Sequence, residues 1–124
     1  MIVIDTSALI ESLSGRPGAA RKLRELIAAG ERILLPTLVL YEWWRGPRTE
    51  EELAAQEELF PSDAALPFGP GEARLAAELY RTLSRPRGRE IDLAIAAVAI
   101  AREAALWTLN PEDFADIENL PLVE

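Results

Sequence analysis

The 124-residue chain contains no cysteine, no histidine and a single lysine, Lys22. Without cysteine there is no disulfide framework, no zinc–thiolate site and no thiol nucleophile. Without histidine there is no Ser-His-Asp or Cys-His catalysis and no imidazole-bound zinc. Any catalysis must therefore rest on carboxylates, hydroxyl groups, arginine, the one lysine, or a metal ion with water.

Long hydrophobic segments are also missing, since no run approaches the roughly 20 apolar residues that a transmembrane helix needs. The start of the chain has neither the basic region nor the cleavage site of a signal peptide, so we expect a cytoplasmic protein with no membrane partner. The sequence has no glycine-rich phosphate loop of the Walker type, which argues against a nucleotide switch. Its length predicts a single domain, residues 1–124, that can bury a proper core.

The formal net charge of −8 argues at first sight against a nucleic-acid partner, because such partners usually require a basic surface. The charges are unevenly distributed, however. Two acidic clusters, at 50–63 and 112–124, are separate from a basic segment at 81–89. A bound cation would also neutralise part of an acidic site. The net charge therefore bears on solubility, and the local distribution of charge bears on partners.

Short apolar segments alternate with helical segments along the chain. Uniformly apolar strands that alternate with helices predict a mainly parallel sheet covered on both faces. The expected fold class is α/β, a three-layer α/β/α domain with a central sheet of four to five strands. Strands are expected at 2–4, 33–35, 64–66, 105–108 and, at one edge, 120–123. Helices are expected at 6–13, 19–29, 38–45, 49–60, 72–85 and 90–104, with a short helical turn at 111–116.

Asp5 ends the first expected strand, and a helix-compatible stretch follows at once. In an open α/β sheet, ligands bind at the carboxyl ends of the strands. A carboxylate at that edge suits a divalent cation and a phosphate-containing substrate. Asp5 or Thr6 can equally cap the next helix, so Asp5 considered alone leaves both interpretations open.

Glu42 interrupts the helical segment 38–46, which is apolar on nearly every side. A charged residue is rarely placed in such a position without a partner. An ion pair with Arg45 or Arg48 is the structural explanation, although exposed pairs of this kind contribute little stability. The pattern favours a functional role for Glu42.

Asp92 opens the very apolar segment 91–100 and shares a helix face with Ala96 and Ala99, which lets a ligand approach closely. First-turn capping is the alternative, because aspartate is favourable near a helix N-terminus. Thr108 and Asn110 follow the end of a later strand, at the same expected edge as Asp5. For these two residues considered alone, an Asn-Pro turn with a helix cap is the favoured explanation.

Considered together, these positions indicate a site at the carboxyl edge of the sheet. Clustered carboxylates repel one another unless a cation is present. Oxygen ligands without histidine or cysteine select Mg²⁺ or Mn²⁺. Such an ion can activate water for in-line attack on a phosphodiester, leaving a 3′-hydroxyl and a 5′-phosphate.

Four ordered segments resemble the motifs of the PIN domain family, and more narrowly those of VapC-type toxins of toxin–antitoxin pairs. The resemblance covers essentially the whole chain and implies a ribonuclease that depends on Mg²⁺, with Mn²⁺ as a substitute. The segments are Asp5-Thr-Ser-Ala-Leu-Ile10, Tyr41-Glu42, Arg89-Glu-Ile-Asp92-Leu-Ala-Ile-Ala-Ala97 and Thr108-Leu-Asn110-Pro-Glu-Asp113-Phe114.

By motif position, the resemblance implies Asp5 and Asp92 as metal ligands and Glu42 as a third acidic site residue. It also implies that Thr6 or Ser7, together with Thr108, orients water, ligand or phosphate. The sequence departs from the family at the fourth acidic position. Asn110 stands where many relatives carry aspartate, and Asp113 follows three residues later. The loss of one negative charge weakens the expectation of a second metal ion.

The basic segment contains Arg85, Arg87 and Arg89 and precedes the Asp92 helix, so these arginines are candidates for holding RNA phosphates. A solvated loop explains them equally well. Trp43 and Trp44 are interpreted as core or interface residues rather than base-stacking residues. The family resemblance implies an antitoxin that inserts a basic side chain into the acidic site and lays a helix near the two tryptophans, and it implies a homodimer.

Other functions remain open. A catalytically silent PIN-like module that binds RNA or protein is the main alternative, with Asn110 as a sign of lost activity. A DNA nuclease is another, because no element that reads a 2′-hydroxyl is identifiable. A receiver domain is disfavoured because the third strand runs into Pro67 and no lysine lies near the last strand. A haloacid-dehalogenase-like phosphatase would need a second aspartate where Ser7 stands.

Overall fold

The computed structural model describes residues 1–124 and contains a small parallel sheet. Strand β1 (Ile2–Ile4) lies in the centre, between β2 (Ile33–Leu34) and β3 (Ala105–Trp107), in the order β2-β1-β3. Ile2 pairs with Ile33 on one side and with Ala105 on the other. Strand β1 is completely buried, as expected for an apolar strand between two neighbours. The α/β class with a parallel sheet is confirmed.

The prediction of four to five strands is wrong, because the two outermost segments form only isolated bridges. Leu66 pairs with Pro36 beyond β2, and Leu122 pairs with Leu106 beyond β3. Both bridges are parallel, and each consists of a single residue pair. The two segments therefore lie beside the sheet without forming further strands. Proline has no N–H to donate to a sheet ladder, and Pro67 and Pro121 stand next to the two bridging leucines. Each outer ladder therefore ends after a single pairing.

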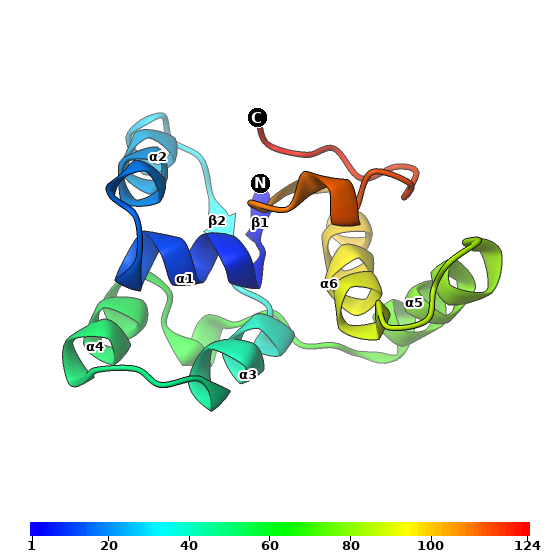
Figure 1. The fold of residues 1–124 in the computed structure, drawn as a ribbon, viewed down its shortest axis with the longest axis horizontal. Coiled ribbons are helices and arrows are strands. Elements are labelled where there is room, and N and C mark those ends of the chain that lie inside the picture. The colour runs from blue at the N-terminus through cyan, green and yellow to red at the C-terminus, as the bar shows by residue number, and fades with distance from the viewer.

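Six α-helices surround the sheet, and the sheet with the helices on its two sides forms three layers. Figure 1 shows α1, α2 and α4 on one side of the sheet and α5 and α6 on the other. Helix α3 lies between α1 and α6, beyond the carboxyl end of β1 (Figure 1). The bounds are α1 Thr6–Ser14, α2 Pro17–Ala28, α3 Thr37–Arg45, α4 Glu50–Leu59, α5 Pro70–Thr82 and α6 Glu90–Ala101, with short 3₁₀ turns η1 Ser62–Ala64 and η2 Pro111–Asp113.

The helix boundaries follow the local signals in the sequence. Thr49 and Glu52 form a capping box at the start of α4, where each side chain bonds the other residue's backbone N–H. Proline opens α2 and α5, as its fixed φ and missing donor favour. Gly30 adopts a φ of +84° just after α2, a conformation that glycine reaches without strain. Local sequence signals therefore account for these helix ends without any tertiary contact.

A single hydrophobic cluster of 23 buried residues forms the core, from β1 and β3 outward to α1, α3 and α6. Trp43 is fully buried in this cluster, whereas the adjacent Trp44 is 50% exposed. The two tryptophans therefore have different environments: Trp43 is a core residue and only Trp44 can contact a partner. No helix in the structure has both the length and the apolar character needed to cross a membrane.

Candidate active site

Asp5 lies directly after β1, at the carboxyl edge of the sheet. Its backbone N–H donates to the carbonyl of Trp107, at 2.9 Å, which joins it to the end of β3. Asp5 occupies the N-cap position of α1, but its side chain makes no capping hydrogen bond. Capping therefore does not account for this carboxylate, which is only 5% exposed.

Two hydroxyl groups hold the Asp5 carboxylate through the same oxygen. Thr108 donates to Oδ2 at 2.7 Å, and Ser7 donates to it at 3.0 Å. The backbone N–H of Leu109 donates to Ser7, and that of Asn110 to Thr108. Residues 101 to 103 positions apart in the sequence thus form one network, as expected for groups at the same sheet edge. Oδ1 of Asp5 accepts no hydrogen bond from the protein and is not sealed from solvent.

Glu42 projects from α3 toward this network, and both of its oxygens have partners. The hydroxyl of Thr6 donates to Oε1, and Arg45 forms an ion pair with Oε2 at 3.3 Å. The expected pair with Arg45 is therefore present. The Glu42 side chain is 17% exposed while that of Arg45 is 57% exposed, so most of this arginine remains in solvent. An exposed partner of this kind compensates only weakly for a shielded carboxylate.

Asp92 lies in the first turn of α6, half-buried, and makes neither a hydrogen bond nor an ion pair. Desolvation is the largest influence on its pKa, followed by the negative charges of Asp5, Asp113 and Glu42. Together these effects raise the pKa of Asp92 from 3.8 to about 6, against an opposing effect of Arg89. Asp92 is therefore an unpaired carboxylate in a field of other carboxylates, which is unfavourable unless a cation is added.

Asn110 and Asp113 are the two candidates for the fourth acidic position, and their surroundings in the structure differ. The Asn110 side chain is exposed and makes no hydrogen bond; only its backbone N–H contacts the Asp5 network. Asp113, at the end of η2, is also exposed, but its charge raises the pKa of Asp92. Asp113 thus lies within electrostatic range of Asp92.

The three arginines of the basic segment also differ. Arg85 and Arg87 are exposed, and their side chains have no partner in the protein. Arg89 instead forms a forked ion pair with Asp116 and donates to two backbone carbonyls. Asp116 has no place in the site expected from the sequence. Its position in an acidic cluster carries no signal that would have paired it with a residue 27 positions away.

The donor set fits a hard divalent cation, although no three acidic side chains lie close enough to form a closed cage. Mg²⁺ usually binds through one or two carboxylates and keeps several waters, so a closed cage is not required. Asp5 offers a free Oδ1 in a nearly buried position, and Asp92 offers an unpaired carboxylate of raised pKa. These two residues therefore fit as the protein ligands.

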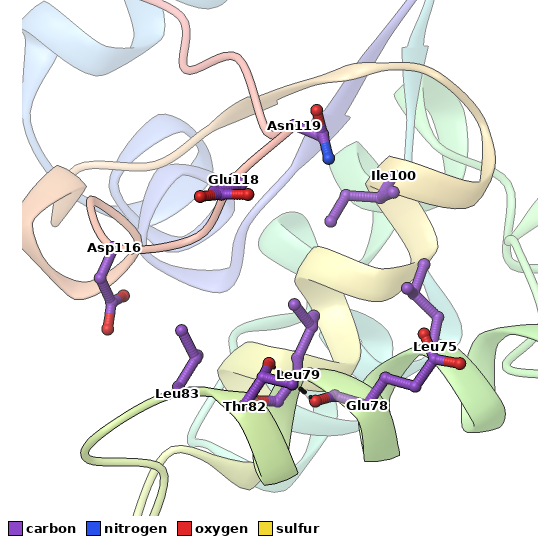
Figure 2. A pocket seen from close by; sticks show the side chains of 9 residues that line it. All are labelled: Leu75, Glu78, Leu79, Thr82, Leu83, Ile100, Asp116, Glu118 and Asn119. Atoms are coloured by element: carbon purple, nitrogen blue, oxygen red, sulfur yellow. Dashed lines mark hydrogen bonds between the residues drawn. The ribbon is translucent and has the colours of Figure 1, made fainter.

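A cavity of about 540 Å³ between α5, α6 and the C-terminal segment lies away from this site. Figure 2 shows Leu75 at one end of it, Ile100 above and Asp116 at the other end. None of the proposed catalytic residues lines this cavity. Its one link to the site is Asp116, the partner of Arg89.

Comparison with known proteins gave consistent results. The family model described as "PIN domain" matches residues 2–120. The chain is 40% identical over 116 residues to "Ribonuclease VapC19" of Mycobacterium tuberculosis, covering 92% of each protein.

Among solved structures, the chain resembles VapBC-5 of Mycobacterium tuberculosis, a toxin–antitoxin system, with a TM-score of 0.68 and 28% identity over 98% of this chain and 96% of that one. It also resembles FitAcB of Neisseria gonorrhoeae, with a TM-score of 0.75 and 20% identity over 100% and 97%. At 20% identity the second match supports only the fold.

Proposed function

The chain belongs to the PIN domain family, and we propose that it is a VapC-type ribonuclease, the toxin of a toxin–antitoxin pair. The observation that carries the proposal is the state of Asp92, a half-buried carboxylate with no partner, whose pKa is raised by burial and by Asp5, Asp113 and Glu42. A protein under no functional constraint gains nothing from such an arrangement, since an unpaired buried charge destabilises the fold.

The proposed reaction is endonucleolytic hydrolysis of RNA with Mg²⁺, for which Mn²⁺ can substitute. When bound, the cation lowers the pKa of water and offsets the charge of the phosphate. Asp5 and Asp92 would hold it, because among the acidic residues of the site only these two combine shielding with a free carboxylate oxygen. The absence of histidine from the chain is consistent with a mechanism that needs no imidazole.

The surrounding residues would orient the reactants. Thr108 and Ser7 occupy Oδ2 of Asp5 and so leave Oδ1 as the oxygen for a ligand. Thr6 fixes one oxygen of Glu42, which places a third carboxylate beside the site. These side chains come from α1, α3 and the segment after β3, and their hydrogen bonds hold them in place before substrate arrives. Such preorganisation is the general basis of catalytic positioning.

The exposed side chains have more peripheral roles in the proposal. Arg85 and Arg87 are free to contact RNA phosphates. Asn110 can contribute an amide oxygen to a ligand, and Asp113 supplies the fourth negative charge.

The direct test is cleavage of structured RNA and of DNA by the purified protein with Mg²⁺, Mn²⁺ or EDTA. Asp5→Asn removes the proposed ligand, and Asp63→Asn, an exposed carboxylate far along the chain, is the matched control. We expect metal-dependent RNA cleavage that Asp5→Asn loses and Asp63→Asn retains. Equal activity of the wild type and Asp5→Asn would mean contamination and would refute the assignment, and preferential cleavage of DNA would refute the substrate.

One observation supports the alternative of a catalytically silent module, namely the neutral amide of Asn110 at the fourth acidic position. Mn²⁺ binding to the wild type without cleavage of any RNA tested would favour this alternative.

The proposed partner is a cognate antitoxin, since solved relatives are described as toxin–antitoxin complexes. A cavity of about 500 Å³ on α3 is lined in part by Tyr41, Trp44 and Arg45, next to Glu42, and presents apolar surface for a partner helix. We also propose a homodimer. Size-exclusion chromatography with light scattering should give twice the monomer mass at micromolar concentration; a monomer there would contradict this part of the proposal.

A further inference from the structure

Arg89 stands immediately before α6, three residues ahead of Asp92, and its guanidinium makes four hydrogen bonds. Two go to the carboxylate of Asp116, at 2.7 and 2.9 Å. The other two go to the carbonyls of Asp113, at 3.0 Å, and Arg85, at 3.2 Å. One side chain therefore joins the loop before α6, the start of α6 and the segment that follows η2.

These contacts leave little of Arg89 for a substrate. A guanidinium has five N–H donors, and four are engaged, so only the Nε–H remains free. The Arg89 side chain is 20% exposed, whereas Arg85 and Arg87 lie in solvent without partners. Of the three arginines, Arg89 is thus the least suited to hold RNA phosphates.

The segment that Arg89 holds contains Asp113, whose backbone has few other ties to α6. The Asp113 N–H bonds only locally, to the carbonyl of Asn110, and the Asp113 side chain is exposed with no hydrogen bond. The contact between Arg89 and the Asp113 carbonyl is therefore the direct link between Asp113 and the residue preceding the Asp92 helix. Asp116, at the edge of the cavity in Figure 2, gives this link its charged anchor.

We propose that Arg89 is a positioning residue, which ties Asp113 to the start of the Asp92 helix and so makes Asp113 the fourth acidic group of the site. This inference rests on the proposed function, because it specifies which side chains complete the same cation-binding site. Only a planar fork can make this set of contacts, since lysine keeps the charge but cannot bond Asp116 at two points and reach two carbonyls as well.

The test compares Arg89→Lys with Arg24→Lys, the same substitution at an exposed arginine on α2. Four quantities are measured: kcat and KM for RNA, the affinity for Mn²⁺, and hydrogen exchange at the amides of Asp113, Phe114 and Ile117, which are hydrogen-bonded within the segment. We expect Arg89→Lys to lower kcat and Mn²⁺ affinity about 10-fold or more, as the loss of a residue that orients a metal ligand does. KM should be nearly unchanged, and hydrogen exchange at the three amides should be faster. Arg24→Lys should leave kcat, KM, Mn²⁺ affinity and exchange unchanged.

A double-mutant cycle on Mn²⁺ affinity isolates the route through Asp113. If Arg89 acts by placing Asp113, then Arg89→Lys should have almost no further effect once Asp113→Asn is present. Asp116→Asn disturbs the pair from outside the site and should reproduce a weaker form of the Arg89→Lys effects, which covers the case where Arg89→Lys folds poorly.

Each result that contradicts the expectation would have a different interpretation. A rise in KM with unchanged kcat and exchange would mean that Arg89 binds RNA, and would overturn the proposal. Lower stability with unchanged Mn²⁺ affinity, or additive effects in the cycle, would reduce the ion pair to a purely structural role. If the wild type binds Mn²⁺ but cleaves nothing, the proposed function fails while Mn²⁺ affinity and exchange still decide the role of Arg89.

Discussion

Asp5 and Asp92, the two carboxylates proposed to hold the cation, lie in opposite surroundings. Asp5 is nearly buried, and two hydroxyl groups and their backbone donors fix it in place. Asp92 is half-buried and unpaired, so burial and its acidic neighbours raise its pKa to about 6. One half of the site is already satisfied by the protein, whereas the other half carries a charge that the protein leaves uncompensated. In the proposed site, Asp5 would therefore set the geometry, and Asp92 would be the residue whose charge a bound cation neutralises.

The largest expected effect comes from removing either carboxylate. Asp5→Asn and Asp92→Asn should each lower RNA cleavage by at least about 100-fold, because a metal ligand contributes several kcal/mol to transition-state stabilisation. Circular dichroism should show a retained fold for both, with Asp63→Asn as the active control. Unfolding of either variant, in place of inactivity with a native spectrum, would restore the capping explanation.

The Asp5 half is tested by Thr108→Val, which keeps the side-chain shape and removes the 2.7 Å hydrogen bond to Asp5. Activity should fall about 10- to 100-fold, as it does when outer-sphere partners of metal ligands are lost. Stability should fall by about 1–3 kcal/mol, because the Asn110 N–H loses its acceptor and Asp5 a donor.

The matched control is Thr82→Val, since the Thr82 hydroxyl bonds only the backbone of its own helix. Thermal unfolding and initial cleavage rates measure both effects. Thr108→Val with wild-type activity would show that Asp5 does not depend on this hydroxyl.

The Asp92 half is tested by the pH dependence of stability. In the unfolded chain this carboxyl titrates near its ordinary pKa of 3.8, and in the folded protein its pKa is about 6. Its destabilising effect therefore develops as the pH rises through this range and is complete above about pH 6. For a fully buried group this pKa shift would correspond to a destabilisation of roughly 3 kcal/mol. Solvent screens the half-exposed Asp92, so we expect a destabilisation of about 1–2 kcal/mol.

Without metal, Asp92→Asn should consequently be more stable than the wild type by that amount at pH 8 and no more stable at about pH 3.5. Denaturant unfolding in EDTA at the two pH values measures the difference. Added Mn²⁺ should remove the advantage by stabilising only the wild type. An advantage of the same size at both pH values would contradict the electrostatic origin of the effect.

The smallest effects are expected at the exposed arginines, outside the comparison of the two carboxylates. Arg85→Gln and Arg87→Gln should each raise KM for RNA a few-fold at unchanged kcat and reduce the salt dependence of binding by about one charge. Arg24→Gln, an exposed arginine on α2, is the control. Equal changes in all three variants would mean a general charge effect rather than a binding surface.

The sequence predicted the features that depend on neighbouring residues. The strand at 2–4, a strand at 105–107 that is one residue shorter than expected, and the approximate positions of the six helices follow from local periodicity and end signals. The meeting of Asp5 with Ser7 and Thr108 was also foreseeable, because parallel strands bring their carboxyl ends to one edge.

Other features depended on contacts between distant segments. Trp43 and Trp44 look alike in the sequence, but the rotation of α3 against the core buries one and exposes the other. Apolar character alone predicted outer strands at Leu66 and Leu122, but the structure has only single bridges there. The proline beside each leucine limits the pairing.

Arg89 shows the same division most clearly, for the sequence presents it as one of several loop arginines. Whether its guanidinium meets RNA or Asp116 is decided by where a segment 27 residues later returns to the start of α6. The chain's local pattern determined which residues end strands, begin helices and interrupt apolar faces, because those preferences act over a few residues. The tertiary structure decided which charges are paired and which are left unpaired, because pairing requires two side chains to arrive at the same point in space.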